Sequence, residues 1–265
     1  MIPYIELTTV QLGPLTLYVW GILVALGFLV GAFMGARFAN RHGLCGKIIY
    51  DLLFWAMLGG LVGGRLGYML FYNFDGLLAD PLSTFAVWDG GLSVYGGFFL
   101  STALGIWFLR RKKVNVLRYS DAAIFGLPFG LWIGRIGCFL IHDHPGTASD
   151  FFLAVDYPDG VARHDHGFYL SINGLLLGLF MLWLSRKERP VGTYMAVFSI
   201  WYGIARFFLD FYRVADVRYG GLTPAQYFSL LLAAFGIWLI FKTRNQTLLW
   251  KVQTRAQGSS TEIQK

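Results

Sequence analysis

The sequence predicts an all-α fold, a polytopic membrane bundle of about seven transmembrane helices. Hydrophobic residues make up 56% of the 265-residue chain and charged residues only 14%, whereas soluble domains carry about 25% charge. Seven apolar runs are long enough to cross a bilayer. The short alternating segments that a membrane β-barrel needs are absent from the sequence. Because backbone groups in lipid must bond internally, we expect each run to be a helix.

The apolar runs follow one another along almost the whole chain. They cover residues 15–38, 48–72, 91–109, 120–141, 168–185, 192–211 and 224–241. We expect one membrane domain at 1–250 and a polar cytoplasmic tail at 251–265. The first run lacks the basic segment and cleavage site of a signal peptide, so we expect it to stay in the mature protein.

Basic residues occupy every second link between the runs. The basic links and the tail hold Arg37, Arg41, Lys47, Arg110, Arg111, Lys112, Lys113, Arg118, Arg186, Lys187, Arg189, Lys242, Arg244, Lys251 and Arg255. The positive-inside rule then places the N-terminus outside and the C-terminus in the cytoplasm. The net charge of +7 is therefore loop charge, and we expect no nucleic-acid partner. Cys45 and Cys138 should lie on opposite sides and not pair.

One arginine lies near the end of the fourth run. Arg135 stands between Gly134 and Gly137, and a guanidinium group in an apolar span has an unfavourable free energy of a few kcal/mol. An internal carboxylate or an anionic ligand must therefore compensate for it. The flanking glycines would let a helix or a phosphate-sized group approach the backbone.

Other polar and aromatic residues are expected at the same outer depth. They come from separate parts of the chain and are Tyr18, Trp20, Arg65, Tyr95, His142, Asp143, His144, Arg163, His164, His166, Arg206, Asp210 and Arg213. Ser93 and Gly146 are expected to be further substrate-binding residues. An outer pocket with excess arginine and aromatic walls suits a phospholipid head group.

Arg206, Asp210 and Arg213 share one helix face by their spacing. They could form an internal ion pair with Arg213 reaching to the interface. Alternatively, Asp210 orients Arg206 in an anion site, which the further arginines at this depth favour.

A second polar and glycine-rich cluster spans residues 88–97, including Asp89 and Ser93. Its two glycine pairs could be helix-packing notches. They could also form a strained turn that directs Ser93 and Tyr95 into the pocket.

Two His-Asp-His triplets, residues 142–144 and 164–166, fall on one outer link. Imidazoles and carboxylates are good zinc ligands, but a solvated loop would also be polar. The alternate spacing within each triplet suits an extended segment rather than one helix face.

Several stretches together resemble the prolipoprotein diacylglyceryl transferase family of bacterial inner membranes. Residues 134–146 resemble its signature Gly-Arg-x-Gly-Asn-Phe-x-Asn-x-Glu-x-x-Gly, with Arg135 and Gly146 matching. Similar stretches include Arg65 with Tyr68, residues 89–97, and Tyr202 through Arg206, Asp210 and Arg213. The likeness covers nearly the whole chain.

The chain also departs from the family pattern. Tyr95 replaces a family histidine, Cys138 and Ile141 replace signature asparagines, and Asp143 replaces the signature glutamate. The family stretch Arg-His-Pro-x-Gln-Leu-Tyr-Glu is kept only as Arg163-His164 and Phe168-Tyr169, and Asp210 replaces a glutamate. The anion-binding positions match, whereas the proton-handling positions differ.

The resemblance implies transfer of a diacylglyceryl group from phosphatidylglycerol to the lipobox cysteine of a prolipoprotein signal peptide. It implies no cofactor and no metal, and a site facing the periplasm in the inner membrane. Arg135 and Arg206, helped by Arg65 or Arg213, would stabilise the leaving phosphate. The thiol needs a base, because the thiolate is the nucleophile. Tyr95 stands at the position of the family histidine, but an ordinary tyrosine is a poor base. His142, His144 or Asp143 could act as the base instead.

Two alternatives remain open from the sequence. One is a diverged lipid-binding membrane protein without turnover, because the base position is altered. The other is a metal-assisted lipid transferase or hydrolase that uses the two His-Asp-His triplets.

Overall fold

A computed structural model describes residues 1–80, 84, 90–214, 217–244 and 249–250. Asp89 and the tail predicted at 251–265 lie outside the described residues. The chain divides into two compact units. The larger unit consists of Met1–Leu44 with Ser120–Lys265, and the smaller unit is Cys45–Tyr119.

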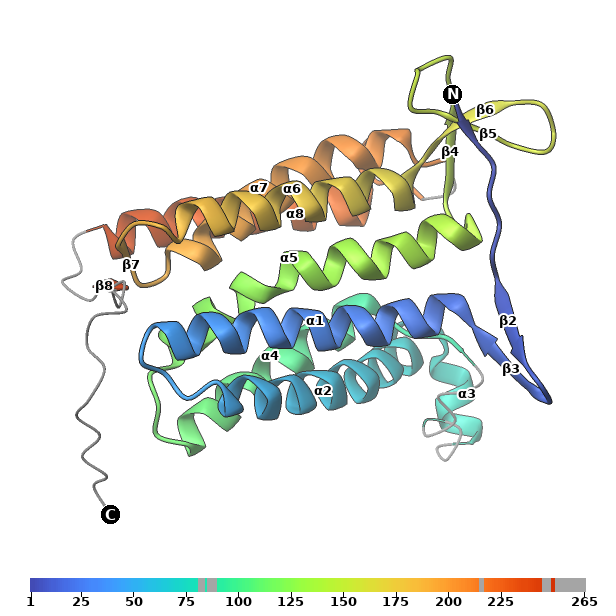
Figure 1. Cartoon of the computed structure of the whole chain (residues 1–265). Helices are drawn as coiled ribbons and strands as arrows, with labels where there is room; N and C mark the ends of the chain where they lie inside the picture. Colours follow the sequence, from blue (N-terminus) through green and yellow to red (C-terminus); the bar gives the residue numbers. More distant parts are fainter. Residues whose placement is uncertain (81–83, 85–89, 215–216, 245–248, 251–265) are drawn as a thin grey trace. The chain divides into compact units, whose positions relative to one another are not determined.

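Seven long helices in the described part of the chain occupy the seven predicted runs (Figure 1). They are α1 (Val19–Arg41), α2 (Lys47–Tyr72), α4 (Val94–Arg111), α5 (Val116–Ile141), α6 (His166–Leu184), α7 (Thr193–Leu209) and α8 (Pro224–Thr243), with a short α3 (Phe74–Ala79). Among the described residues five helices, α1, α2, α5, α6 and α8, are long and apolar enough to span a membrane. The protein is thus a mostly helical multi-pass membrane protein, and spanning by α4 and α7 stays a prediction.

The N-terminal segment differs from the predicted helix start. Strands β2 (Thr9–Leu12) and β3 (Leu15–Tyr18) form an antiparallel hairpin. Gly13 lies in the left-handed region at φ +61°, and Pro14 follows it, a pair that favours a turn. The expected helix start at residue 15 was therefore wrong, and α1 begins at Val19.

Short strands cover one end of the larger unit. Strands β1 (Ile2–Pro3), β4 (Pro145–Ala148), β5 (Val155–Asp156) and β6 (Ala162–Asp165) form a sheet in the order β1-β5-β6-β4. Strand β1 pairs with β5 in parallel, and β6 is antiparallel to both β5 and β4. The sheet therefore joins the N-terminus to the link between α5 and α6 (Figure 1).

The helices of the larger unit pack closely. Figure 1 shows α1 running along α5, while α6, α7 and α8 form a second group. A Cβ atom at Gly27 of α1 would lie 2.6 Å from the Gly130 carbonyl oxygen of α5. Glycine at this position therefore allows the two backbones to approach each other.

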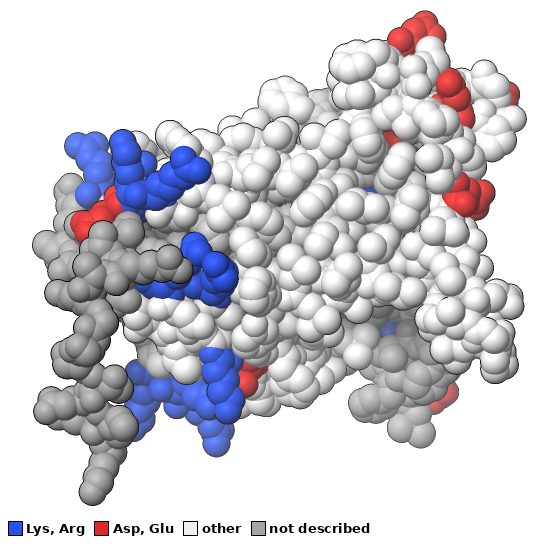
Figure 2. Space-filling model, viewed as in Figure 1, with Lys and Arg blue, Asp and Glu red and all other residues white. Residues whose placement is uncertain are grey.

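Charge is unevenly distributed over the larger unit. Figure 2 shows basic side chains over the link between α6 and α7, and acidic side chains over the loop between β5 and β6. The α6–α7 link carries Arg186, Lys187 and Arg189, whereas Asp156 ends β5 and Asp159 lies on the loop. This asymmetry matches the alternation of basic and acidic links in the sequence.

A buried carboxylate fixes the basic end. Asp121 of α5 has no exposed surface. It accepts hydrogen bonds from the backbone N–H groups of Gly192 (2.8 Å) and Met195 (2.7 Å) and from Trp250 Nε1 (2.8 Å). Trp250 belongs to β8 (Leu249–Trp250), which pairs with β7 (Arg189–Pro190). Since α7 has no side-chain cap of its own, Asp121 supplies one from another helix.

We expect Asp121→Ala to lower the free energy of unfolding by about 3 kcal/mol or more, because it leaves three buried donors without an acceptor. Thermal unfolding in detergent would measure the loss. Asp51→Ala is the matched control, because Asp51 lies 3.9 Å from Lys112 in an exposed pair and should change stability by about 1 kcal/mol or less. Equal thermal unfolding midpoints for Asp121→Ala and Asp51→Ala would contradict the role of Asp121 as the cap of α7.

Candidate functional site

Arg135 lies in the last turns of α5 and is half-buried. Its Nη1 lies 3.7 Å from Cys138 Sγ, one turn further along the helix. Among the described residues, no carboxylate comes within ion-pair distance of this guanidinium group. The charge of Arg135 is therefore not balanced by an internal acid in that part of the chain.

The end of α7 carries two further arginines and one aspartate. Arg206 Nη2 lies 2.9 Å from Asp210 Oδ1, and Arg213 Nη1 lies 4.0 Å from the same oxygen. Asp210 is fully buried. Its second oxygen accepts a hydrogen bond from the hydroxyl of Thr223, which caps α8. This arrangement fixes the carboxylate so that it orients Arg206.

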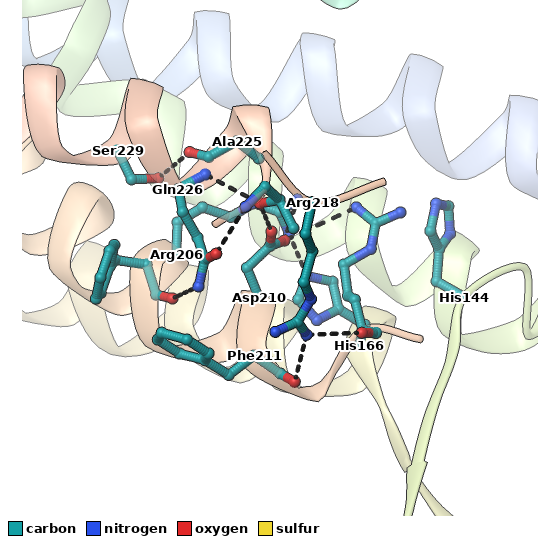
Figure 3. A network of polar contacts seen from close by, with 12 residues as sticks. His144, His166, Arg206, Asp210, Phe211, Arg218, Ala225, Gln226 and Ser229 are labelled. Atoms are coloured by element: carbon teal, nitrogen blue, oxygen red, sulfur yellow. Dashed lines mark hydrogen bonds and ion pairs between the residues drawn. The ribbon is translucent and has the colours of Figure 1, made fainter. Parts of the chain in front are cut away.

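His166, the first residue of α6, joins this cluster. Its ring is 2% exposed, and its Nε2 contacts Arg206 Nη1. Figure 3 shows His166, Arg206 and Asp210 converging. The charges of Arg135, Arg206 and Arg213 all act on the His166 ring. Three guanidinium groups thus act on one imidazole, and the carboxylate of Asp210 pairs with two of them, so the cluster has excess positive charge.

Gly146 of β4 holds the end of α7 in place. It forms an isolated antiparallel bridge with Arg213. A Cβ atom here would lie 2.7 Å from the carbonyl oxygens of both His164 and Tyr212. Only glycine therefore lets β4 approach the backbone next to Arg213. We predicted Gly146 as a substrate-binding residue, and its observed contacts position Arg213.

His142 lies in a separate buried cluster. Its Nδ1 lies 2.7 Å from Asp165 Oδ2, and its Nε2 lies 3.2 Å from the carbonyl oxygen of Ile5. Tyr157 donates to the same Asp165 oxygen at 3.0 Å, and Tyr4 stacks on the ring. Burial, reinforced by Asp165, raises the pKa of Tyr157 above its ordinary value, so its hydroxyl remains a donor. Both His142 nitrogens are occupied, which leaves it poorly placed as a base for a substrate thiol.

His144 and Asp143 form a more open pair. His144 Nδ1 lies 2.6 Å from Asp143 Oδ1, and about a third of each side chain is exposed. The ring has no aligned hydrogen bond at Nδ1 within the described chain, so the contact is electrostatic. His144 also interacts electrostatically with His166. Figure 3 shows His144 to the right of the network around His166, Arg206 and Asp210, with no contact drawn to it.

The two His-Asp-His triplets do not converge on a metal site. Across the described residues, no group of three or more His, Cys, Asp or Glu side chains could hold a metal ion. His164 contacts the Tyr169 hydroxyl at 2.7 Å, and burial lowers the pKa of its ring. The four histidines of the triplets have four different partners. The metal-assisted alternative therefore has no structural basis in the described chain.

The smaller unit contains Arg65, Ser93 and Tyr95. Arg65 is buried and donates to the carbonyl oxygens of Gly90 and Gly91, whose φ angles are +78° and +67°. Ser93 caps α4 by accepting from the Gly96 N–H group at 3.4 Å. Tyr95 lies half-buried in the first turn of α4. The first glycine pair thus forms a turn in the left-handed region, which glycine adopts readily.

The second glycine pair packs against a helix. A Cβ atom at Gly97 would lie 2.9 Å from the Gly60 carbonyl oxygen of α2. The packing interpretation therefore applies to Gly97, whereas the direction of Ser93 and Tyr95 into a pocket stays a prediction.

Tyr18 and Trp20 flank the start of α1. Tyr18 ends β3 and has an exposed fraction of 70%, and Trp20 is 45% exposed. Their contact with a substrate stays a prediction, because neither belongs to the buried arginine cluster.

Comparison with known proteins places these features in a family. A family model described as prolipoprotein diacylglyceryl transferase matches residues 8–242. The chain belongs to this family. Phosphatidylglycerol–prolipoprotein diacylglyceryl transferases from Solidesulfovibrio magneticus and Chromohalobacter salexigens are 37% and 34% identical to it. The alignments cover 90% and 92% of this chain, respectively, and 94% of each relative.

Sequence reasoning about this family overlooked His166 as a site residue. It stands at the variable position of the family stretch Arg-His-Pro-x-Gln-Leu-Tyr-Glu, where the motif gives no reason to choose it. Two signals were available, its place in the second His-Asp-His triplet and its predicted position at the outer depth of the site. Asp165, in the same triplet, caps α6 by accepting from the Phe168 N–H group at 2.9 Å. Because His166 is the first residue of α6, this cap helps to position the His166 ring.

Proposed function

We propose that this chain transfers the diacylglyceryl group of phosphatidylglycerol to the lipobox cysteine of prolipoproteins. The printed names of its relatives describe this activity. The observation that carries the proposal is the Arg135 guanidinium group, which has no carboxylate partner among the described residues and lies near Arg206 and Arg213. A lipid phosphodiester would provide the missing negative charge.

The proposed reaction is a thiol alkylation. The thiolate sulfur attacks the carbon of the diacylglyceryl group that is bonded to the phosphate oxygen, and a thioether forms. The carbon–oxygen bond breaks, and its electron pair leaves with the oxygen as glycerol phosphate. Since negative charge grows on the phosphate, preorganised guanidinium groups stabilise the transition state more than the bound lipid. Arg135 and Arg206 would bind this phosphate, while Asp210 keeps Arg206 oriented.

We assign His144 as the base that deprotonates the thiol. Asp143 lies beside its Nδ1 and would stabilise the imidazolium that forms, leaving Nε2 to accept the proton. We expect His144→Gln to lower kcat roughly 100-fold or more, measured as glycerol phosphate release. His164→Gln is the matched control and should retain turnover. Equal activity of His144→Gln and wild type would exclude His144 as the base and would favour Tyr95.

Three of the predicted site residues belong to the smaller unit. Tyr95, Ser93 and Arg65 match or replace residues of the family stretches, and we propose that they contact the lipid or the signal peptide. Tyr95→Phe separates a packing role from a proton-transfer role because it removes only the hydroxyl group. Tyr18 and Trp20 would contact the acyl region near the interface.

We further propose that the arginine cluster faces the periplasm in the bacterial inner membrane. The opposite end of the larger unit carries Arg37, Arg41, Arg186, Lys187, Arg189, Lys242 and Arg244. The positive-inside rule favours the cytoplasm for that end. The N-terminus would then be periplasmic and the C-terminus cytoplasmic.

A complementation experiment tests the function. Cells depleted of their own transferase would express this chain, and a prolipoprotein would be scored for lipidation by its gel shift. We expect lipidated product to return. Good expression in the membrane without any lipidated product would reject turnover and favour the lipid-binding alternative.

A further inference from the structure

The unused nitrogen of His166 is a buried polar group. In the described chain its Nδ1 has less than 1 Å² of accessible surface and no hydrogen-bond partner. The whole residue is 2% exposed. A buried donor or acceptor without a partner is unfavourable, and native proteins rarely keep one without a reason.

The contact at the other nitrogen determines where the ring proton lies. Nε2 faces Nη1 of Arg206, and a guanidinium group has donors but no acceptor. Nε2 must therefore accept, which leaves the proton of a neutral ring on Nδ1. The buried nitrogen without a partner is thus an N–H donor.

Among the described residues, none accepts a hydrogen bond from this donor. The positive charges of Arg135, Arg206 and Arg213 act on the ring, and guanidinium groups cannot accept. The nearby carboxylate of Asp210 already faces Arg206 and Thr223. A negatively charged oxygen of a ligand would accept from this donor and would also interact favourably with Arg135.

We propose that His166 donates a hydrogen bond from Nδ1 to a phosphate oxygen of the lipid substrate. This role rests on the proposed transferase function and adds an uncharged donor to the arginines of the site. When the carbon–oxygen bond breaks, its electron pair moves to the phosphate group, and the hydrogen bond strengthens without proton transfer. His166 is then a catalytic residue through this contact, while the thiol proton goes to a separate base.

Two substitutions separate a donor from a base. Asparagine can present an amide N–H group near the position of Nδ1 but cannot act as a base at neutral pH, whereas alanine provides neither group. We expect His166→Ala to bind dioctanoyl phosphatidylglycerol about tenfold more weakly than wild type, and His166→Asn to stay within about threefold. His164→Asn is the control for loss of a neighbouring histidine. Thermal unfolding in detergent would confirm that each variant is folded.

A phosphate-free probe makes the binding test specific. Dioctanoylglycerol lacks the phosphate, so it should bind wild type, His166→Ala and His166→Asn equally. In turnover assays, His166→Ala should lower kcat more than it changes KM, because the hydrogen bond strengthens in the transition state. His166→Asn should restore most of that kcat.

The outcomes of this experiment are distinct. Equal loss in His166→Asn and His166→Ala would show that the ring acts as a base or in packing, and would overturn the donor role. Unchanged phosphatidylglycerol binding in both variants would also overturn it. If wild type binds with the expected pattern but transfers no lipid, the proposed function fails while the phosphate contact stands.

Discussion

Arg135→Ala is expected to reduce diacylglyceryl transfer roughly 100- to 1,000-fold, because it removes a guanidinium donor from the leaving phosphate. The rate would be measured as glycerol phosphate release by the purified protein with phosphatidylglycerol and a lipobox peptide. Stability should respond differently. Since no carboxylate among the described residues lies within ion-pair distance of Arg135, removing its charge from an apolar span should leave the thermal midpoint unchanged or raise it.

The lysine substitution is the matched control for this position. Arg135→Lys keeps one positive charge but loses the planar fork that binds two phosphate oxygens. Its turnover should fall between that of wild type and Arg135→Ala. If Arg135→Ala unfolds the protein, the residue has a structural partner and is not reserved for a ligand.

Arg206→Ala should nearly abolish transfer and also destabilise the protein. Its guanidinium group lies 2.9 Å from Asp210, which is fully buried, and loss of one partner from a buried ion pair typically lowers stability by about 3–5 kcal/mol. Arg213, at 4.0 Å from the same oxygen, would offset part of that loss. The kinetic assay and thermal unfolding should therefore both respond, in contrast to Arg135→Ala.

A second substitution separates the two effects of Arg206→Ala. Adding Asp210→Asn removes the buried charge but keeps an acceptor for the Thr223 hydroxyl, so part of the stability should return without turnover. Arg218→Ala is the control, because Arg218 is exposed and donates to the backbone oxygens of Phe211 and Arg213. Recovery of turnover in the double variant would rule out Arg206 as a phosphate ligand.

Apolar runs alone were sufficient to locate the helices. A continuous run long enough to cross a bilayer has few alternatives, because each backbone group must bond within the segment. The start of α1 was misplaced because Leu15 and Leu17 are as apolar as the helix that follows. Their pairing with Thr9–Leu12 is a tertiary effect that a hydropathy pattern does not contain.

The site was predictable where charge and helical spacing coincide. Arg206 and Asp210 are four residues apart on a helix, so their pairing follows from local geometry. The roles of His142 and His166 could not be separated in this way. Each belongs to a similar triplet, and their partners, Asp165 and Arg206, lie 23 and 40 residues away along the chain.

The mixed sheet constrains the order of assembly during synthesis. Strand β1 pairs with β5, and the Ile5 carbonyl contacts His142, so these contacts cannot form until α5 and the segment after it have been translated. Formation of these long-range contacts is slowed by the entropy of closing a large loop. The nascent chain should therefore insert its early helices while its N-terminal segment is still unpaired, and the catalytic end should be among the last regions to mature.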